Sequence, residues 1–434
     1  MTAILLMFNL FVLLTAYLVI KTVREALILS GGGAEVKSYA AAGQALLLLL
    51  VVPWYGSFAS KVKRIKLINR VTLFFISHLF VFYMLAQLRV PLGVAFFLWV
   101  GIFNLLVIAQ FWAFANDLYT REQGERLFTI VAFGGALGAI LGPMLAGWLF
   151  GPLGAYQLML VAAALLAISI FTTSAVNSRE SRRLQTNRIK TDTEAPLGKE
   201  GGFALVLGHR YLFLIAVLMV VLNLVNTTGE FVLGKTVAKE AKRAAVTEEQ
   251  QSAAIGDKGK LTSAQREQIV QAFIGKFYAD FFFWVSLVGA VLQLFLVSRI
   301  LKYVGVSGAL FFLPIISLAT YSLMAFFPIL GYIQLAKIFE NSTNYSLQNT
   351  ARQTLFLSTS REAKYKAKAA IDTFFVRIGD VLSAVVVFIG SYWLLNTQAF
   401  ATINIALVAV WLLLVAIIGR HYKKLTLAEV KTAA

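Results

Sequence analysis

Charged side chains stand inside the first apolar segment of the chain, residues 3–29, which is long enough to cross a bilayer. Lys21, Arg24 and Glu25 fall within an arc of about 100° on one face of the expected helix. An ionised side chain at the bilayer centre costs roughly 3 kcal/mol, so each should face a bundle interior and meet a partner or a ligand. Two cations beside one carboxylate predict a site for an anion, and a guanidinium suits bidentate contact with phosphate. A purely structural pair between Arg24 and Glu25 is the alternative.

Comparable residues recur in the second half of the chain. Residues 21–27 can be aligned with residues 226–232, and this weak internal repeat places Glu25 opposite Glu230. We therefore expect both glutamates to lie in a shared cavity, where they hold cations in place or carry a coupling proton. Lys337 and Glu340 are charged residues inside a later apolar span, and Asn344 and Gln348 continue the same polar stripe one and two turns further on. Because charges are costly in lipid, we expect Lys337, Glu340 and Asn344 at the substrate site.

A second group of polar residues is expected to gate the path or to hold helices together. Its members are Asn116, Asp117, Arg126, Lys276, Asp280, Asp372, Arg377 and Asp380. Spacings of three and four residues on a helix predict ion pairs between Lys276 and Asp280, Lys337 and Glu340, and Arg377 and Asp380.

The composition places these residues in a chain that is mostly dissolved in lipid. Of 434 residues, 59% are hydrophobic and 14% are charged, and the mean hydropathy is +0.77. Because a bilayer core needs roughly 20 apolar residues per helix, we expect about twelve spans. They are residues 3–29, 38–58, 68–88, 92–119, 127–150, 155–174, 206–234, 268–297, 306–328, 331–357, 368–395 and 399–419. The predicted fold class is an all-α polytopic membrane protein.

The net charge of +18 is explained by membrane topology. Lysine and arginine gather in alternate connections, such as residues 61–66, 179–190 and 361–368, and again after the last span. The positive-inside rule then places both termini in the cytoplasm. The lipid bilayer is thus an expected partner, and nucleic acid is not.

A polar, basic segment divides the chain into two sets of six spans. We expect an N-terminal half at 1–174, a cytoplasmic linker at 175–205 and a C-terminal half at 206–434, with an extramembrane helical insert at 235–267. Parallel repeats of this kind are typical of the major facilitator architecture, in which the substrate site lies between the repeats. In span five, small-residue spacing predicts close helix packing by Gly134, Gly135, Gly138, Gly142 and Gly147.

Other classes of function find little support in the sequence. There is no cysteine, and three scattered histidines do not form a metal cluster. Neither a phosphate loop nor a catalytic set occurs, so we expect no cofactor and no enzyme. Two alternatives remain, a transporter of another organic anion and a non-transporting membrane interaction protein on the same fold. The oligomeric state is not predicted.

Three segments together resemble the nucleotide transporter family, the ATP/ADP antiporters of plastids and intracellular bacteria and their bacterial relatives. They read KTVREALILSGGGAEVKSY, FWAFANDLYTREQGERLF and ENSTNYSLQNTARQTLFLSTSREAKYKAKAAIDTFFVRIGD. The resemblance implies a major facilitator fold, a nucleotide or similar phosphorylated anion as substrate, and a bacterial inner membrane location. It also implies nucleotide contact by Arg24 and Lys368, and it places Asn226 where the family has a glutamate, one turn from Glu230. Exchange and proton symport both remain open, with Glu25, Glu230 and Glu340 as proton carriers in the second case.

Overall fold

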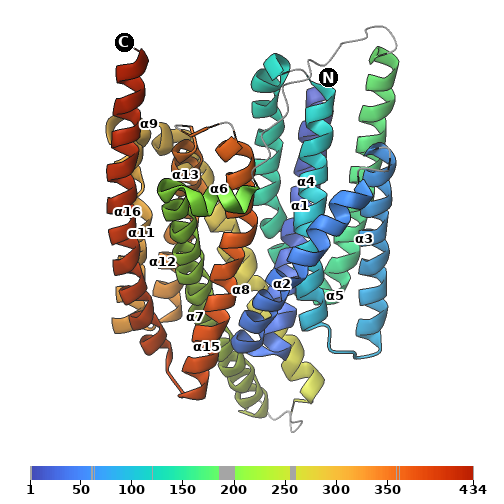
Figure 1. Cartoon of the computed structure of the whole chain (residues 1–434). Coiled ribbons are helices and arrows are strands. Elements are labelled where there is room, and N and C mark those ends of the chain that lie inside the picture. The colour runs from blue at the N-terminus through green and yellow to red at the C-terminus, as the bar shows by residue number, and fades with distance from the viewer. Residues whose placement is uncertain are drawn as a thin grey trace. The chain divides into compact units, whose positions relative to one another are not determined.

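The computed structural model describes residues 2–59, 62, 64–119, 121–184, 201–254, 261–357, 359–360 and 362–433. Within these ranges every regular element is a helix or a π-helical turn, and no strand occurs (Figure 1). Contacts divide the chain into two compact units. The first holds residues 1–40, 47–193 and 237–286, and the second holds residues 41–46, 194–236 and 287–434.

The first unit is built mainly from the five N-terminal helices. These are α1 (Thr2–Gly31), α2 (Gly33–Ala59), α3 (Arg64–Gln87), α4 (Gly93–Leu118) and α5 (Arg121–Leu184). Two further helices supply its remaining residues, the later part of α7 (Arg210–Ala254) and most of α8 (Ser263–Val291). Both α3 and α4 pack on the pair formed by α1 and α5.

Helix α5 contains two of the predicted spans, because it bends at Gly154. This residue has φ 76° and ψ 178°, a backbone conformation that side chains other than glycine rarely adopt. The predicted break between residues 127–150 and 155–174 falls at this bend. Before the bend, a Cβ on Gly134 or Gly138 would overlap a carbonyl oxygen of α1. Close packing by the glycines of span five is therefore confirmed here, where α1 and α5 touch backbone to backbone.

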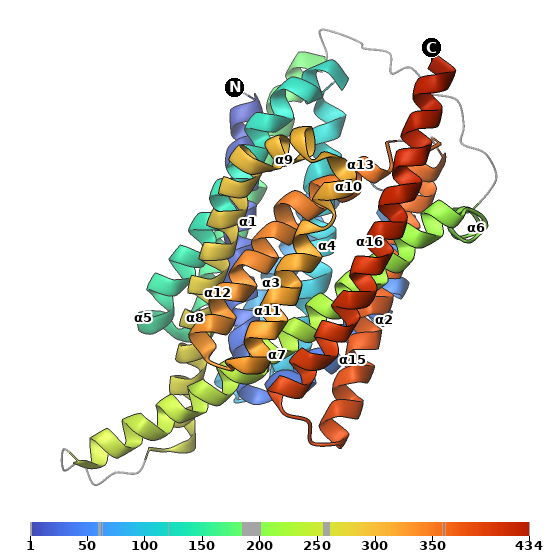
Figure 2. The ribbon, with the colours of Figure 1, turned by 90° about the vertical axis from the view of Figure 1, so that its left-hand side faces the viewer.

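The second unit is built from α6 (Gly202–Gly208), the earlier part of α7, and the C-terminal helices. The latter are α9 (Val297–Tyr303), α10 (Gly305–Ala309), α11 (Phe312–Phe326), α12 (Leu330–Thr343), α13 (Asn349–Leu355), α14 (Lys368–Ala370), α15 (Val376–Tyr392) and α16 (Thr397–Ala433). Four π-helical turns interrupt them: η1 (Leu292–Leu296), η2 (Asn344–Gln348), η3 (Ala363–Ala367) and η4 (Ile371–Phe375). Helix α11 packs between α12 and α16 (Figure 2).

Ten helices of the described residues are long and apolar enough to cross a membrane. One of them, residues 127–179, includes the bend at Gly154 and so covers two predicted spans. The predicted span 331–357 corresponds to α12, η2 and α13, which follow one another without a break. The prediction of an all-α polytopic chain is confirmed.

Two predicted connections lie partly outside the described residues. Of the linker at 175–205, residues 185–200 are not described, and α5 occupies the part before them. In the insert at 235–267, α7 continues as helix to Ala254 and α8 begins at Ser263. Residues 255–260 between them are not described.

Candidate functional site

Glu25 is the centre of a buried cluster of charges in the first unit. Its side chain is 1% exposed. Lys37 Nζ lies 2.6 Å from Glu25 Oε2, and Arg24 forms an ion pair with the same carboxylate, with its Nε donating at 3.1 Å. One carboxylate therefore holds two cations. Arg24 and Lys37 are 14% and 12% exposed, so all three groups lie largely inside the bundle.

The turn between α1 and α2 brings Lys37 back to Glu25. Helix α1 ends at Gly31, and Gly33 has a positive φ of 77°, which reverses the chain direction within three glycines. Lys37 then lies in the first turns of α2. Sequence reasoning missed this residue, although the triple glycine before it signals a tight reversal.

An aromatic ring lies beside each of three cations of this unit, Lys21, Arg24 and Lys37. Lys21 Nζ lies 4.1 Å from the ring centre of Phe282. Arg24 Cζ lies 4.6 Å from the ring centre of Phe97, and Lys37 Nζ lies 5.3 Å from that of Tyr278. These distances allow cation–π attraction, which helps to hold positive charge away from water. The cluster thus combines cations with flat apolar surfaces.

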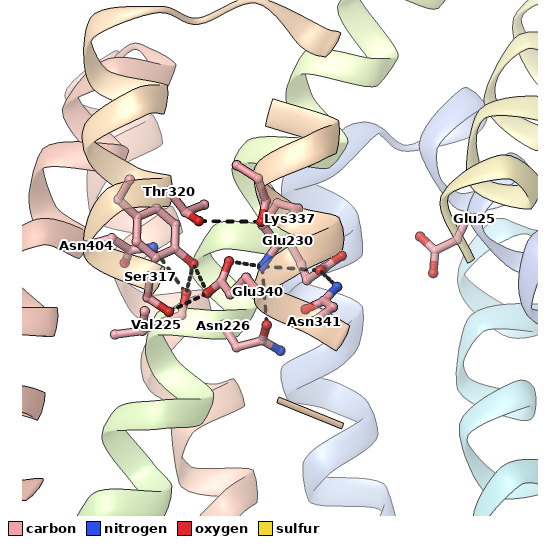
Figure 3. Close-up of polar contacts among 12 residues, drawn as sticks. Glu25, Val225, Asn226, Glu230, Ser317, Thr320, Lys337, Glu340, Asn341 and Asn404 are labelled. Atoms are coloured by element: carbon pink, nitrogen blue, oxygen red, sulfur yellow. Dashed lines mark hydrogen bonds and ion pairs between the residues drawn. The ribbon is translucent and has the colours of Figure 1, made fainter. Parts of the chain in front are cut away.

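Lys337 is the centre of a second cluster, in the second unit, and here the signs are reversed (Figure 3). The lysine is fully buried. Its Nζ lies 2.9 Å from Glu340 Oε2 and 3.5 Å from Glu230 Oε1, and it donates to Asn226 Oδ1 at 3.3 Å. The predicted pairing of Lys337 with Glu340 is present. Asn341, which was not predicted, donates to Glu230 at 3.0 Å.

Glu340 is held by neutral donors as well as by Lys337. Ser317 Oγ donates to its Oε1 at 3.0 Å, and the hydroxyl of Tyr321 lies 3.0 Å from the same oxygen. Tyr321 fits because Gly229 of α7 has no side chain, and a Cβ there would overlap the hydroxyl. Asn404 of α16 donates to the carbonyl of Val225 at 3.1 Å. Four helices, α7, α11, α12 and α16, thereby meet at one polar centre.

Asp372 is the centre of a third cluster, also in the second unit. Arg352 Nη1 lies 3.4 Å from Asp372 Oδ1, and Lys368 Nζ lies 3.9 Å from its Oδ2. As at Glu25, two cations share one carboxylate. Arg352 and Lys368 are 20% and 31% exposed. Sequence reasoning missed Arg352, although it is a charged residue inside a predicted span.

Asp380 of α15 links this helix to α7. Arg377 Nη1 lies 3.1 Å from Asp380 Oδ2, so the predicted pair is present. Asn223 and Thr227 of α7 donate to Asp380 Oδ1 at 2.7 Å and 3.0 Å. This arrangement agrees with a structural role for the pair.

The other predicted residues lie apart from these clusters. Asp117 is 53% exposed and forms an ion pair with Arg64 of α3 at 2.5 Å. Its neighbour Asn116 is exposed. Asn344 is half-buried at the start of η2, and both Lys276 and Asp280 of α8 are exposed, so their pairing stays a prediction. The side chain of Arg126 lies outside the described residues.

Three solved structures similar to this chain are a homologue of a transporter and two transporters. A bacterial homologue of the iron transporter ferroportin, in an inward-facing state, has a TM-score of 0.61 and 12% identity over 97% of this chain and 98% of that one. The nucleoside transporter NupG has a TM-score of 0.58 and 14% identity over 98% of each chain. The human organic anion transporter MFSD10 has a TM-score of 0.56 and 15% identity over 95% of this chain and 98% of that one. The chain therefore has the major facilitator fold, as predicted.

The sequence assigns the family within that fold. A family model described as TLC ATP/ADP transporter matches residues 94–422, well over half of the chain. The chain belongs to the TLC ATP/ADP transporter family, which confirms the resemblance noted in the sequence. It is a multi-pass membrane protein and a transporter, not an enzyme. A search of curated proteins gave no significant match.

Proposed function

We propose that the chain moves a nucleotide, or a similarly phosphorylated anion, across the membrane by alternating access. The observation that carries this proposal is the cluster at Glu25, where two buried cations share one carboxylate. One positive charge is left over among membrane-spanning helices, where an uncompensated charge is costly. A phosphate group would supply the missing negative charge, and the guanidinium of Arg24 can bind it in a bidentate manner.

The rings beside the cations support a substrate that also has a flat part. Phe97, Tyr278 and Phe282 lie within contact distance of Arg24, Lys37 and Lys21, respectively. Nucleobases stack on aromatic side chains, and each stacked base contributes about 1–3 kcal/mol. Family membership supports the same substrate class.

Uptake into proteoliposomes tests the proposal directly. Purified protein should take up radiolabelled ATP or ADP, and Arg24→Ala should lower the uptake rate at limiting substrate at least tenfold. Lys66→Ala removes an exposed cation of α3 and should behave like wild type. If wild-type protein neither takes up nor binds any nucleotide, the proposed substrate class is wrong.

The same vesicles separate exchange from proton symport. Under exchange, uptake should require nucleotide inside the vesicle and should not respond to a protonophore. In proton symport, an imposed inward pH gradient should drive uptake into empty vesicles. A symport result would direct attention to Glu25, Glu230 and Glu340 as carriers.

We also propose a bacterial inner membrane location with both termini in the cytoplasm, on the positive-inside rule. The chain has no cysteine, so a single introduced cysteine is a clean reporter. An impermeant maleimide should label exposed positions on the cytoplasmic side, Ser360→Cys and Lys424→Cys, in inside-out vesicles, and Gln251→Cys in right-side-out vesicles. The reverse pattern would invert the topology.

A further inference from the structure

Gln348 has a buried carboxamide without a partner. The residue is 1% exposed, and neither its Nε2 nor its Oε1 has a hydrogen-bond partner. Buried polar groups in native proteins are nearly always hydrogen-bonded, so a side chain with both its donor and its acceptor unused calls for an explanation. A bound ligand that offers one acceptor and one donor would satisfy both.

Two polar neighbours of Gln348 have hydrogen-bond partners within the helix, whereas Gln348 has none. Ser346 and Thr350 donate to the carbonyls of Ser342 and Ser346, at 2.6 Å and 3.0 Å, so the helix itself satisfies their hydroxyls. Gln348 is the last residue of η2, a π-helical turn that packs on η1 and α11. Such turns cost helix stability and are frequent at functional sites.

Arg352 lies one helical turn beyond Gln348 and provides positive charge. Its Nη2 donates to Asn349 Oδ1 at 2.9 Å and its Nη1 faces Asp372, but its Nε is buried without a partner. Lys368 shares Asp372 with it, so one positive charge is left over. Unused hydrogen-bonding atoms therefore occur on two consecutive turns of the same helical segment.

Lys337 was also predicted at the substrate site, but its surroundings differ from those of Arg352. It is fully buried and lies between two carboxylates. A phosphate group at Lys337 would have to approach Glu340, which repels it. The geometry therefore favours Arg352 over Lys337 for anion contact.

We propose that Gln348 and Arg352 form the substrate-contacting face of the second unit. The carboxamide of Gln348 pairs with a nucleobase edge that presents a donor beside an acceptor, and Arg352 contacts a phosphate. Glutamine pairs in this bidentate way with adenine, and such a pair discriminates between bases. This inference rests on the proposed function, since it names the groups that read the two parts of a nucleotide.

Competition against uptake of labelled ATP separates the two contacts. Inhibition constants are measured for ATP, GTP, CTP, UTP and tripolyphosphate, using the full chain in proteoliposomes. Gln348→Met keeps the side-chain volume but cannot form the proposed hydrogen bonds to the base. The ratio between the largest and the smallest inhibition constant of the four nucleotides should therefore fall about fivefold or more. The constant for tripolyphosphate should not change. Arg352→Gln should instead raise all five constants about tenfold together and leave the ratio among the four nucleotides as in wild type.

Two further variants and a stability measurement complete the test. Gln268→Met replaces an exposed glutamine of α8 and is the matched control. Gln348→Glu keeps the acceptor but loses the donor, and it should reorder the four nucleotides. If Gln348 had a purely structural role, its replacement would lower the thermal stability of the protein. We expect Gln348→Met instead to be at least as stable as wild type.

The outcomes are distinguishable. The role of Gln348 is overturned if Gln348→Met leaves the ratio of inhibition constants among the four nucleotides unchanged. It is also overturned if the variant raises all the inhibition constants, including that of tripolyphosphate, by the same factor. A tripolyphosphate constant that is unchanged in Arg352→Gln overturns the role of Arg352. A wild-type protein that transports no nucleotide contradicts the proposed function itself, and tripolyphosphate binding by wild type and Arg352→Gln then still decides whether this face binds anions.

Discussion

The clusters at Glu25 and at Lys337 are built from the same residue types in opposite proportions. Glu25 is a buried carboxylate shared by two cations, whereas Lys337 is a buried cation shared by two carboxylates. In both, the central group is the most deeply buried, at 1% and 0% exposed. A charge at that depth is stable only with partners, so the central group is fixed and the outer groups define what can bind.

The outer groups therefore differ in function. At Glu25 they are the cations Arg24 and Lys37, and an arriving anion can share them. At Lys337 the outer groups are carboxylates, of which Glu230 is 23% exposed and Glu340 only 3%. The first cluster suits a phosphate, while the second joins α7 to α12. The comparison therefore predicts that removing a central residue lowers stability, whereas removing an outer cation at Glu25 lowers substrate affinity.

Removal of Lys337 should have the largest effect on stability. Lys337→Met leaves Glu340 buried without a cation, and breaking a buried pair in this way costs about 3–5 kcal/mol. We expect a large fall in the thermal unfolding temperature of the detergent-solubilised protein. The double variant Lys337→Met/Glu340→Leu removes both charges and should recover most of the loss. Lys302→Met, at an exposed lysine of α9, is the control, and a single variant as stable as that control would contradict a structural role for Lys337.

Glu25→Gln should separate stability from binding. Without the carboxylate, Arg24 and Lys37 face each other as like charges, and we expect a loss of about 2 kcal/mol, because hydrogen bonds to charged groups contribute that much. Affinity for tripolyphosphate should nevertheless rise, since the competing negative charge is gone. Equilibrium binding to purified protein measures this, with Arg24→Gln as the variant that should weaken binding. Weaker binding by both variants would mean that Glu25 contacts the substrate itself.

The sequence predicted the fold well because the membrane leaves few choices. Long apolar segments must form helices in lipid, so the predicted spans are mostly helical in the described residues, although span 206–234 crosses the break between α6 and α7. The pair of Lys337 with Glu340 followed from helical spacing alone. The prediction divided residues 127–174 into two spans, and Gly154 is where the helix bends.

The partners of the charges were predicted less well, because most of them come from other helices. Spacing along one helix cannot show that Lys37 returns to Glu25, or that Arg352 reaches Asp372. Nor does it indicate that Tyr321 and Ser317 donate to Glu340. Gln348 was not predicted as a site residue, since the lack of a hydrogen-bond partner is visible only once every neighbour has been placed.

Lys37 should affect binding more than stability. In Lys37→Met, Arg24 still neutralises Glu25, so we expect unfolding free energy to fall by no more than about 1 kcal/mol, as for a typical hydrogen bond. The surplus positive charge is lost, however, and nucleotide affinity should fall about tenfold, which corresponds to 1.4 kcal/mol. Lys37→Arg keeps the charge and should retain most of the affinity. Binding unchanged in Lys37→Met would leave Arg24 as the sole cation that matters at this cluster.

The smallest effect is expected where a neutral donor supports a buried charge. Tyr321→Phe keeps the ring and removes the hydroxyl that lies 3.0 Å from both Glu340 Oε1 and the carbonyl of Val225. Glu340 still has Lys337 and Ser317, so the loss should be about 0.5–1.5 kcal/mol, the net contribution of one hydrogen bond. Ser317→Ala removes the other neutral donor and should cost a similar amount. The double variant should cost more than the sum of the two, because the carboxylate then depends on Lys337 alone. Simple additivity in the unfolding free energies would show that Lys337 by itself satisfies Glu340, and that the two hydroxyls serve only to join α11 to α12.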